Sequence, residues 1–463
     1  MNGLGGFFGE PPKEDDCTER WDCGDWTSCT EQGSQTRACT DLNSCGTIED
    51  KPGIQKNCDV EDLPPTDEGS PHALGEQKIA VILYTTSNDS NTFGRTKEDF
   101  YREIFSETNG FSFNNYLKEI SYGKTWMTGF VTPWLHFDTE YPFLQDIITA
   151  ADPYIDYSET KRIIMIRPRS FGILGGASTD YVNYTTNEGR QGLQLTSAYY
   201  NPSDGVPDYS RQQIITQGFS TGYGFHLLAH EYGHTLQSPL GVKHAVNLYC
   251  IEPPFKQTTP YKITDDGELD PSCIVFGVES YSDQLGAGKG HHNTIIKEKV
   301  GWLQENQILE IEQGESGIYT LNPLETAEGI KVIKIPRVRC STTGEISDPC
   351  GGDGVGWYYL EYRRNIGNDR PLFLPPIVDY EGVEIRIDGY LVNETVSSEI
   401  VYSTDYRSSL LLDMNVNDPF SHVLGKGETF TDPHQGTVIE IEDLTDERVL
   451  VKVVFENSND GED

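Results

Sequence analysis

The chain contains 463 residues, of which 36% are hydrophobic, so it is long enough for two or three domains with their own cores. Acidic residues outnumber basic residues by 73 to 35, and the formal net charge is −38. This charge excludes nucleic acid as a partner, because its phosphates would be repelled. The longest purely apolar run, Ile79 to Leu83, is too short to span a bilayer, so we expect no membrane span.

The acidity is interpreted mainly as an aid to solubility. Bound structural calcium and a saline habitat are the alternatives, although no segment matches the calcium-binding loop of an EF-hand. The amino terminus lacks the basic start and the long apolar stretch of a signal peptide, so we expect that any export signal has been removed. Residues 1–16 are predicted to be a flexible N-terminal segment.

Cysteines cluster near the start of the chain. Six of the ten lie within residues 17–58, a segment too small and polar to fold around an apolar core. We expect three disulfides there; a zinc knuckle is the alternative, but the spacings do not form paired CxxC units. The six cysteines are Cys17, Cys23, Cys29, Cys39, Cys45 and Cys58.

Residues between these cysteines resemble a thrombospondin type 1 repeat, in which an arginine stacks on tryptophan faces. The matching residues are Trp21, Trp26 to Cys29, Gly33 and Gln35 to Cys39. The resemblance implies a small disulfide-rich module at residues 17–58. Its stacked side chains are interpreted as a stabilising device, or as a site for a matrix or cell-surface ligand.

Residues 59–77 are acidic and contain Pro64-Pro65, which is typical of a linker. Strand patterns at Ile79–Tyr84 and Arg162–Ile166 then alternate with a helical stretch around Phe100–Tyr116. This alternation predicts an α+β domain of the α/β type, in which helices pack on a sheet.

The segment Gly192–Tyr200 is predicted to be a strand just upstream of the most informative motif of the chain. We interpret it either as an ordinary strand or as an edge strand along which an extended substrate would pair.

Residues 230–234 read His-Glu-Tyr-Gly-His. Helical positions i and i+4 lie one turn apart on the same face, so both imidazoles can reach one metal ion. A pair of core histidines is the alternative, but the preceding apolar run predicts a buried helix, where unpaired imidazoles are costly. We therefore predict that His230 and His234 bind zinc, with Glu231 as the general base. His226 continues the stripe, but a helix rises about 12 Å over eight residues, so it cannot share an ion with His234.

Hydrolytic zinc usually has three protein ligands and keeps a fourth position for water. Pro239 and Gly241 end the helix and let the chain turn back, so His244 is the candidate third ligand. A downstream carboxylate such as Glu279 is one alternative, and His292 is another.

These residues resemble the metzincin metallopeptidases, whose motif is HExxHxxGxxH, and within them the gametolysin-like group. Gly241–Ala245 matches that register after a few extra residues. Gln237 stands where the family has glycine, so we expect a longer helix and a longer path to His244. Further matches lie at Glu119–Lys124, Asp283–Gly286, His291–Asn293, Lys297, Gly301–Leu303, Leu321–Glu325 and Leu411–Met414. The resemblance implies a metzincin-like zinc peptidase domain at residues 78–303.

The turn Asp283–Gly286 is similar to the family's Met-turn, with Leu285 in place of the methionine. Leucine and methionine have similar volumes, so the packing floor beneath the zinc should be kept. The tyrosine that some metzincins carry beyond this turn is Ala287 here. Tyr281 and His291 are candidates for an auxiliary role, with a structural role as the alternative for each.

Beyond Trp302 the chain consists of short β-rich segments separated by Gly, Asn, Asp and Pro. The segments are Val332–Ile335, Trp357–Tyr362, Val383–Ile387 and Val449–Val454. They predict an all-β, sandwich-like domain at residues 304–455. The acidic tail at residues 456–463 is predicted to be disordered.

The other four cysteines are expected to pair as Cys250 with Cys273 and Cys340 with Cys350. Oxidised cysteines indicate an extracellular, secreted protein. The chain as a whole predicts a multidomain, zinc-dependent endopeptidase that hydrolyses extracellular or cell-surface proteins. The alternative is an adhesion protein whose peptidase domain has lost activity through Leu285 and the lengthened zinc loop.

Overall fold

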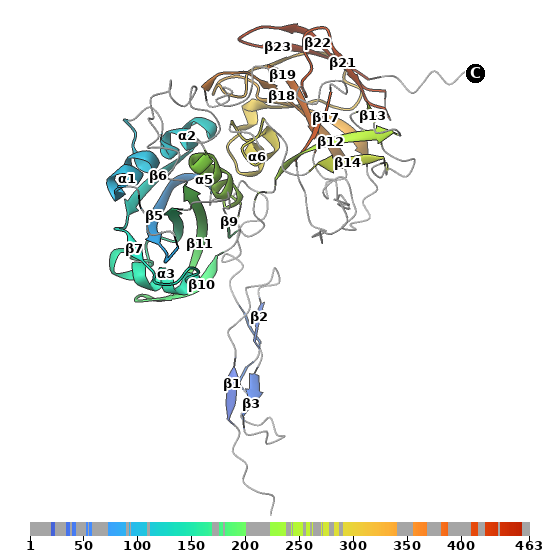
Figure 1. Ribbon diagram of the computed structural model, residues 1–463. Coiled ribbons are helices and arrows are strands. Elements are labelled where there is room, and N and C mark those ends of the chain that lie inside the picture. The colour runs from blue at the N-terminus through green and yellow to red at the C-terminus, as the bar shows by residue number, and fades with distance from the viewer. Residues whose placement is uncertain are drawn as a thin grey trace, which may run out of the picture. The chain divides into compact units, whose positions relative to one another are not determined.

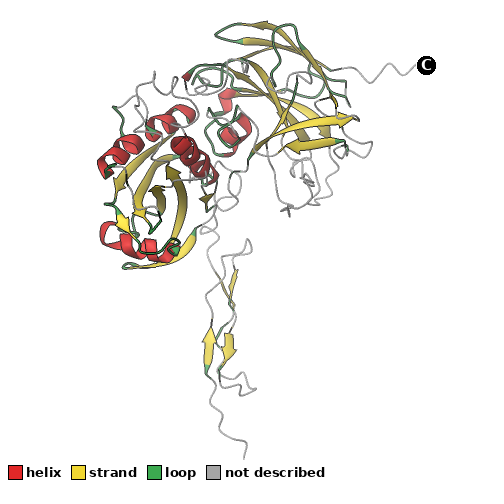
Figure 2. Cartoon of the chain, viewed as in Figure 1, coloured by secondary structure: helices red, strands yellow, loops and turns green. Residues whose placement is uncertain are grey.

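In the computed structural model the chain divides into two units, Met1–Asp67 and Glu68–Asp463. The architecture is mixed α/β and mostly strand, as Figure 2 shows. The described residues are 20–23, 34–37, 39–42, 52–53, 55–57, 73–88, 92, 94–108, 112–168, 176–178, 181–200, 223–237, 242, 244–252, 256–259, 262, 270, 272–276, 282–286, 290–339, 355–367, 381–387, 409–414, 422–433 and 436–455.

The described residues of the first unit form two small antiparallel pairs of strands. One joins β1 (Trp21–Cys23) to β3 (Cys39–Asp41), and the other joins β2 (Ser34–Thr36) to β4 (Gln55–Asn57). Cys23 is disulfide-bonded and stands opposite Cys39 in the register. Several predictions for this unit fall outside the described residues: the flexible segment 1–16 and Cys17, Cys29, Cys45 and Cys58.

The second unit begins with a sheet that contains seven of the described strands, in the order β10-β11-β8-β5-β6, with β7 paired to β5 and β9 to β11. All pairs are parallel except those of β10 and β9 with β11. Its strands are β5 (Gly75–Thr85), β6 (Thr125–Val131), β7 (Leu135–His136), β8 (Arg162–Pro168), β9 (Gly176–Ala177), β10 (Val182–Thr186) and β11 (Gly189–Tyr200).

Four of the described α-helices pack on this sheet: α1 (Lys97–Phe105), α2 (Phe113–Ile120), α3 (Leu144–Ala151) and α5 (Tyr223–His234). A 3-10 turn, η3 (Asp152–Tyr154), follows α3. Strand β5 shows why both faces are covered, because successive side chains of a strand point to opposite faces. Ile79, Val81 and Leu83 join a core with residues of α1, α2 and α5, whereas Ala80 and Ile82 join a core with residues of α3. Figure 1 shows α1, α2 and α5 on one side of the sheet and α3 on the other.

Strand β11 is not a free edge. Its first half pairs with β10, Thr196 and Ser197 pair with β9, and residues Gln194–Tyr200 pair with β8 on the other side. The strands β10 and β9 occupy the outer side of β11 as far as Ser197, which favours the interpretation as an ordinary strand over that part; a substrate-binding role for the rest of Gly192–Tyr200 stays a prediction.

Two further sheets follow. One contains eight of the described strands, in the order β13-β12-β20-β19-β18-β17-β15 with β14 paired to β12, and the other has the order β16-β23-β22-β21. Their inner faces share one apolar core, which includes Leu248, Ile335, Ile385, Ile441 and Val451. The first comprises β12 (Ala245–Glu252), β13 (Lys256–Thr259), β14 (Cys273–Phe276), β15 (Ile308–Glu310), β17 (Val332–Arg339), β18 (Val355–Arg363), β19 (Gly382–Ile387) and β20 (Ser409–Leu412). The second comprises β16 (Gly317–Leu321), β21 (Thr429–Thr431), β22 (Val438–Leu444) and β23 (Val449–Val454).

The eight-stranded sheet contains strands from both sides of the boundary expected after residue 303. Strand β12 pairs in parallel with β20, with Ala245 opposite Ser409. Between the two regions lie the helix α6 (Thr294–Lys299) and the 3-10 turn η6 (Glu305–Gln307). Strands β12, β13 and β14 thus belong to the later sheet, and the regions before and after residue 303 share one unit.

The expected disulfide between Cys250 and Cys273 is confirmed and joins β12 to β14. Cys340, Cys350 and the tail 456–463 lie outside the described residues. None of the described helices is long and apolar enough to cross a membrane.

Candidate metal centre

The direction in which α5 presents its histidines is set by Tyr232. This side chain is buried, its hydroxyl accepts a hydrogen bond of 3.0 Å from Arg162 on β8, and its ring packs edge-on against Phe113. Helical residues two apart point to nearly opposite sides. Burial of Tyr232 in the core therefore turns His230 and His234 away from the sheet.

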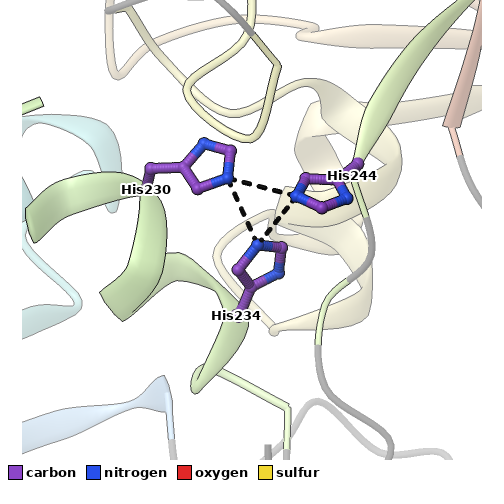
Figure 3. Close-up of side chains that lie close together, drawn as sticks. All are labelled: His230, His234 and His244. Atoms are coloured by element: carbon purple, nitrogen blue, oxygen red, sulfur yellow. Dashed lines mark hydrogen bonds between the residues drawn. The ribbon is translucent and has the colours of Figure 1, made fainter. Parts of the chain in front are cut away.

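The structure brings His230, His234 and His244 together, as Figure 3 shows. Their three Nε2 atoms lie 3.2–3.3 Å from one another. Tetrahedral zinc with Zn–N distances of about 2.0–2.1 Å would hold its ligand nitrogens about 3.3–3.4 Å apart. The spacing of the three rings therefore fits a zinc ion.

Hydrogen bonds at the far side of two rings define their tautomers. Nδ1 of His230 donates to the carbonyl oxygen of Gln284 at 2.9 Å, and Nδ1 of His234 donates to that of Val242 at 2.6 Å. A carbonyl can only accept, so in a neutral ring the proton is on Nδ1 and Nε2 carries the lone pair. Converging lone pairs repel one another unless a cation lies between them, and a backbone carbonyl is a usual second partner for a zinc-bound histidine.

The protonation equilibria agree with this geometry. Burial lowers the pKa of His234 to about 3, and the neighbouring His244 lowers it further in the same direction. Burial also lowers the pKa of His230, against the effect of its hydrogen bond to Gln284. Both rings are therefore neutral near pH 7, which is the form that binds a metal.

Helix α5 ends at His234, so the expectation that Gln237 prolongs it is wrong. The chain leaves the helix through a short turn, in which the amide of Leu236 donates to the carbonyl of Gly233. The chain then comes back to the end of α5, where the amide of Val242 donates to the carbonyl of His234 at 3.2 Å. This return brings His244 back to the helix end, directly before β12.

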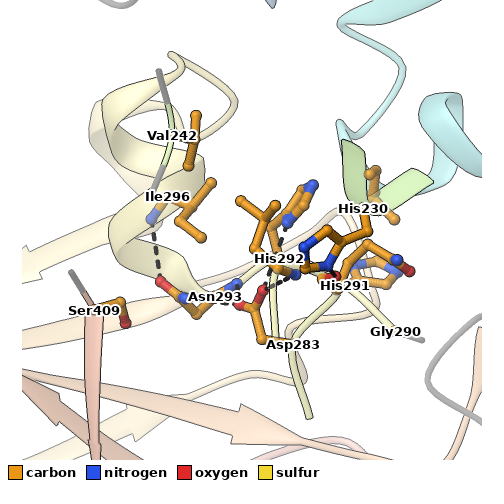
Figure 4. A network of polar contacts seen from close by, with 12 residues as sticks. His230, Val242, Asp283, Gly290, His291, His292, Asn293, Ile296 and Ser409 are labelled. Atoms are coloured by element: carbon orange, nitrogen blue, oxygen red, sulfur yellow. Dashed lines mark hydrogen bonds and ion pairs between the residues drawn. The ribbon is translucent and has the colours of Figure 1, made fainter. Parts of the chain in front are cut away.

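The turn Asp283–Gly286 supports two of the three histidines through consecutive carbonyls. Gln284 accepts from the His230 ring, and Leu285 accepts from the amide of Ala245, which follows His244. The carboxylate of Asp283 holds the turn, since it accepts from the amide of Leu285 at 2.7 Å and twice from Asn293 at 2.6 Å (Figure 4). Asp283 therefore fixes the supports of the site.

Leu285 is fully buried against α5, facing Gly233. His292 is buried beside it, with Nδ1 3.6 Å from Asp283 and its ring against Trp302. His292 is thus placed under the helix and outside the group formed by His230, His234 and His244.

The remaining candidates are placed differently. His291 is fully buried, and its Nδ1 accepts from Lys297 at 2.9 Å, which is a structural contact without exposure to a substrate. Tyr281, Glu279 and Ala287 lie outside the described residues, as does the side chain of His226.

Glu231 follows the first histidine on α5 and is partly buried. Burial raises the pKa of its carboxyl to about 7. A carboxyl with a pKa close to the working pH can both accept and return a proton, which suits a general acid–base group.

Two groups that bear on the site were not predicted. The carbonyls of Gln284 and Val242 carry no signal in a sequence, since every residue has one. The buried residues Glu361, Arg363, Glu384 and Arg386 had a signal, a Glu-x-Arg pattern repeated on two strands.

No protein-family model matches the chain, and no curated protein matches it.

Proposed function

We propose that the protein is a secreted zinc-dependent endopeptidase of metzincin type, acting on extracellular or cell-surface proteins. One observation carries the proposal: the Nε2 atoms of His230, His234 and His244 converge at 3.2–3.3 Å from three directions. Two of these rings direct Nδ1–H to backbone carbonyls, which leaves Nε2 to the metal. Three imidazoles are a donor set that hydrolytic zinc sites use.

His230, His234 and His244 would hold the zinc, which would supply Lewis acidity to the reaction. Glu231, next to the first ligand, takes the proton from the attacking water and gives it to the leaving amine. The raised pKa of Glu231, about 7, is the property that this exchange needs.

Secretion is supported by the disulfide between Cys250 and Cys273 and by the oxidised Cys23, because such bonds persist in oxidising compartments. The thrombospondin-like segment 17–58 would then attach the enzyme to a matrix or cell-surface ligand. Two β-sheets around a shared core support a sandwich-like second half. Structural calcium remains a second candidate cofactor on the ground of acidity alone.

The test combines metal analysis with one substitution. Purified protein should contain about one zinc per chain and cleave a denatured general protein substrate. Glu231→Gln should retain the zinc and the fold while hydrolysis falls at least about 100-fold. Cleavage that survives this substitution unchanged would contradict the role of Glu231.

The second candidate is an adhesion protein with an inactive peptidase domain, favoured by Leu285 in the Met-turn position. Leu285→Met decides between the two. For an active enzyme the change should alter hydrolysis only modestly, because the volumes are similar. Zinc-loaded wild type that cleaves nothing, with cleavage restored by Leu285→Met, would establish the adhesion reading.

A further inference from the structure

Four ionic side chains are buried behind the turn that supports the histidines. Glu361 and Arg363 lie on β18, Glu384 and Arg386 lie on β19, and each is at most 1% exposed. The two glutamates stand opposite each other in the register. Burial alone would raise the pKa of Glu361, but the two arginines outweigh it and hold that pKa below its usual range.

A gain in stability does not by itself explain why these four ionic side chains are buried together. Removing an ion from water costs several kcal/mol, and well-packed apolar residues in the same place are often as stable. Directional hydrogen bonds fix geometry in a way that apolar packing does not, so the contacts that the buried ions make beyond one another are the place to look for their role.

Arg386 has contacts beyond its carboxylate partners. Its Nε donates to Glu361 at 3.1 Å and one terminal nitrogen donates to Glu384 at 2.7 Å. The same nitrogen donates to the hydroxyl of Ser282 at 3.1 Å, and the other terminal nitrogen donates to the hydroxyl of Ser409 at 3.4 Å. The two glutamates fix the plane of the guanidinium, and the two serines lie at its outer edge.

Both serines adjoin supports of the metal ligands. Ser282 immediately precedes Asp283, which starts the turn whose Gln284 carbonyl holds His230. Ser409 is the strand partner of Ala245, the residue after His244. The guanidinium of Arg386 is thus hydrogen-bonded to two serine hydroxyls. One serine lies next to the turn that supports His230, and the other pairs with the residue that follows His244.

We propose that Arg386 is a positioning residue for the metal centre, which sets the distance between His230 and His244 through Ser282 and Ser409. This inference rests on the proposed zinc site. Only arginine suits the role, because its planar fork reaches several acceptors in fixed directions, whereas a lysine presents a single point of charge. Residues that orient metal ligands typically change metal affinity about 10–100-fold when they are lost.

The experiment compares Arg386→Lys with Arg337→Lys in the full chain. Arg337 is equally buried, lies on β17 of the same sheet and has its guanidinium beside Gly356, so it controls for the loss of a buried arginine. Zinc affinity is measured by competition with a chelator, and ligand geometry by the visible spectrum of bound Co²⁺. Thermal unfolding of the zinc-free proteins measures how much each substitution destabilises the fold.

Arg386→Lys should weaken zinc binding by about 10–100-fold and alter the Co²⁺ spectrum, while Arg337→Lys does neither. Ser282→Ala and Ser409→Ala should each weaken zinc binding less than Arg386→Lys, and neither should weaken it further when combined with Arg386→Lys. If Arg386→Lys does not fold, the two serine variants carry the test alone.

Two failures are distinguishable. Wild type that binds no zinc would overturn the proposed function and this inference with it. Wild type that binds zinc, with unchanged affinity and Co²⁺ spectrum in Arg386→Lys and in both serine variants, would overturn the role of Arg386 and leave the proposed function standing.

Discussion

A β-carbon placed on Gly233 would lie 3.0 Å from Cδ2 of Leu285, so α5 approaches the turn Asp283–Gly286 closely at a position that has no side chain. The same added carbon would lie 3.1 Å from Cε1 of His292. Both neighbours are buried and have little space to move away. A side chain at position 233, between His230 and His234, would therefore require Leu285 and His292 to shift by a few tenths of an ångström.

Gly233→Ala should destabilise the protein and weaken zinc binding. Overpacking costs about 1–3 kcal/mol, more than the roughly 1 kcal/mol that alanine gains over glycine in a helix. Urea unfolding measures the change. Combining Gly233→Ala with Leu285→Ala should cost less than the sum of the two single changes, because the leucine is then no longer overpacked. Strict additivity would contradict the contact.

His244→Ala should reduce bound zinc as much as His230→Ala does, because each removes one of three converging nitrogens. His292→Ala is the matched control, a buried histidine that lies under the helix and outside the group. We expect it to lower stability but to keep zinc at about one per chain. Metal analysis after dialysis against buffer without zinc measures the zinc content of each variant. Full zinc occupancy in His244→Ala would show that His244 is not a ligand.

Removing zinc with a chelator should lower the melting temperature. A ligand that binds only the folded state adds about 4 kcal/mol when its concentration is 1,000 times its Kd. Calorimetry with and without added zinc measures the shift. The shift should vanish in a variant that lacks both His230 and His234; if it persists there, the zinc acts at another site.

Stability should fall as the pH drops below about 6.5, in part because of His291. Burial, and then the charge of Lys297, hold the pKa of His291 well below its usual value. The folded protein keeps this ring neutral, whereas the unfolded chain takes up a proton below about pH 6.5, so acid favours unfolding by up to about 1.4 kcal/mol per pH unit. His291→Asn retains an acceptor for Lys297 and should flatten the slope between pH 7 and 5, measured by urea unfolding. An equal slope in both proteins would show that His291 does not cause the loss of stability in acid.

Deleting residues 1–67, the first unit, should leave zinc content and hydrolysis of short peptides unchanged. Ending the chain after residue 303 should abolish zinc binding, because β12 then loses its partner β20. Circular dichroism and metal analysis of the two shortened chains measure these outcomes. A chain ending at residue 303 that folds and binds zinc would show that β12 holds His244 without β20.

The parts of the site that were predicted from sequence depend on local spacing. His230 and His234 share a face because a helix repeats every 3.6 residues, and that relation needs no other part of the chain. The confirmed disulfide between Cys250 and Cys273 was also predictable, because these cysteines flank one short insertion. The strand at Ile79–Tyr84 was predicted from a continuous apolar run, which is typical of a strand buried on both faces.

The parts that were missed depend on long-range pairing. Glu384 and Arg386 alternate with Val383 and Ile385, so the pattern suggests a strand with one polar, exposed face. The structure buries that face as well, because α6 and the turn Asp283–Gly286 pack there and need ionic partners; the amide of Thr294 donates to Glu361 at 2.6 Å. No local pattern shows that β12 joins strands that come much later in the chain.

The pairing of Ala245 with Ser409 has a consequence for biosynthesis. A ribosome that adds about 5–20 residues per second needs on the order of ten seconds or more to extend the chain from the first of these residues to the second. During that interval the residues of α5, with His230 and His234, have already been made, but the strand after His244 has no β20 to pair with. The strand that follows the third of the converging imidazoles therefore gains its partner late, and the group of His230, His234 and His244 is supported on all sides only when most of the chain has been made.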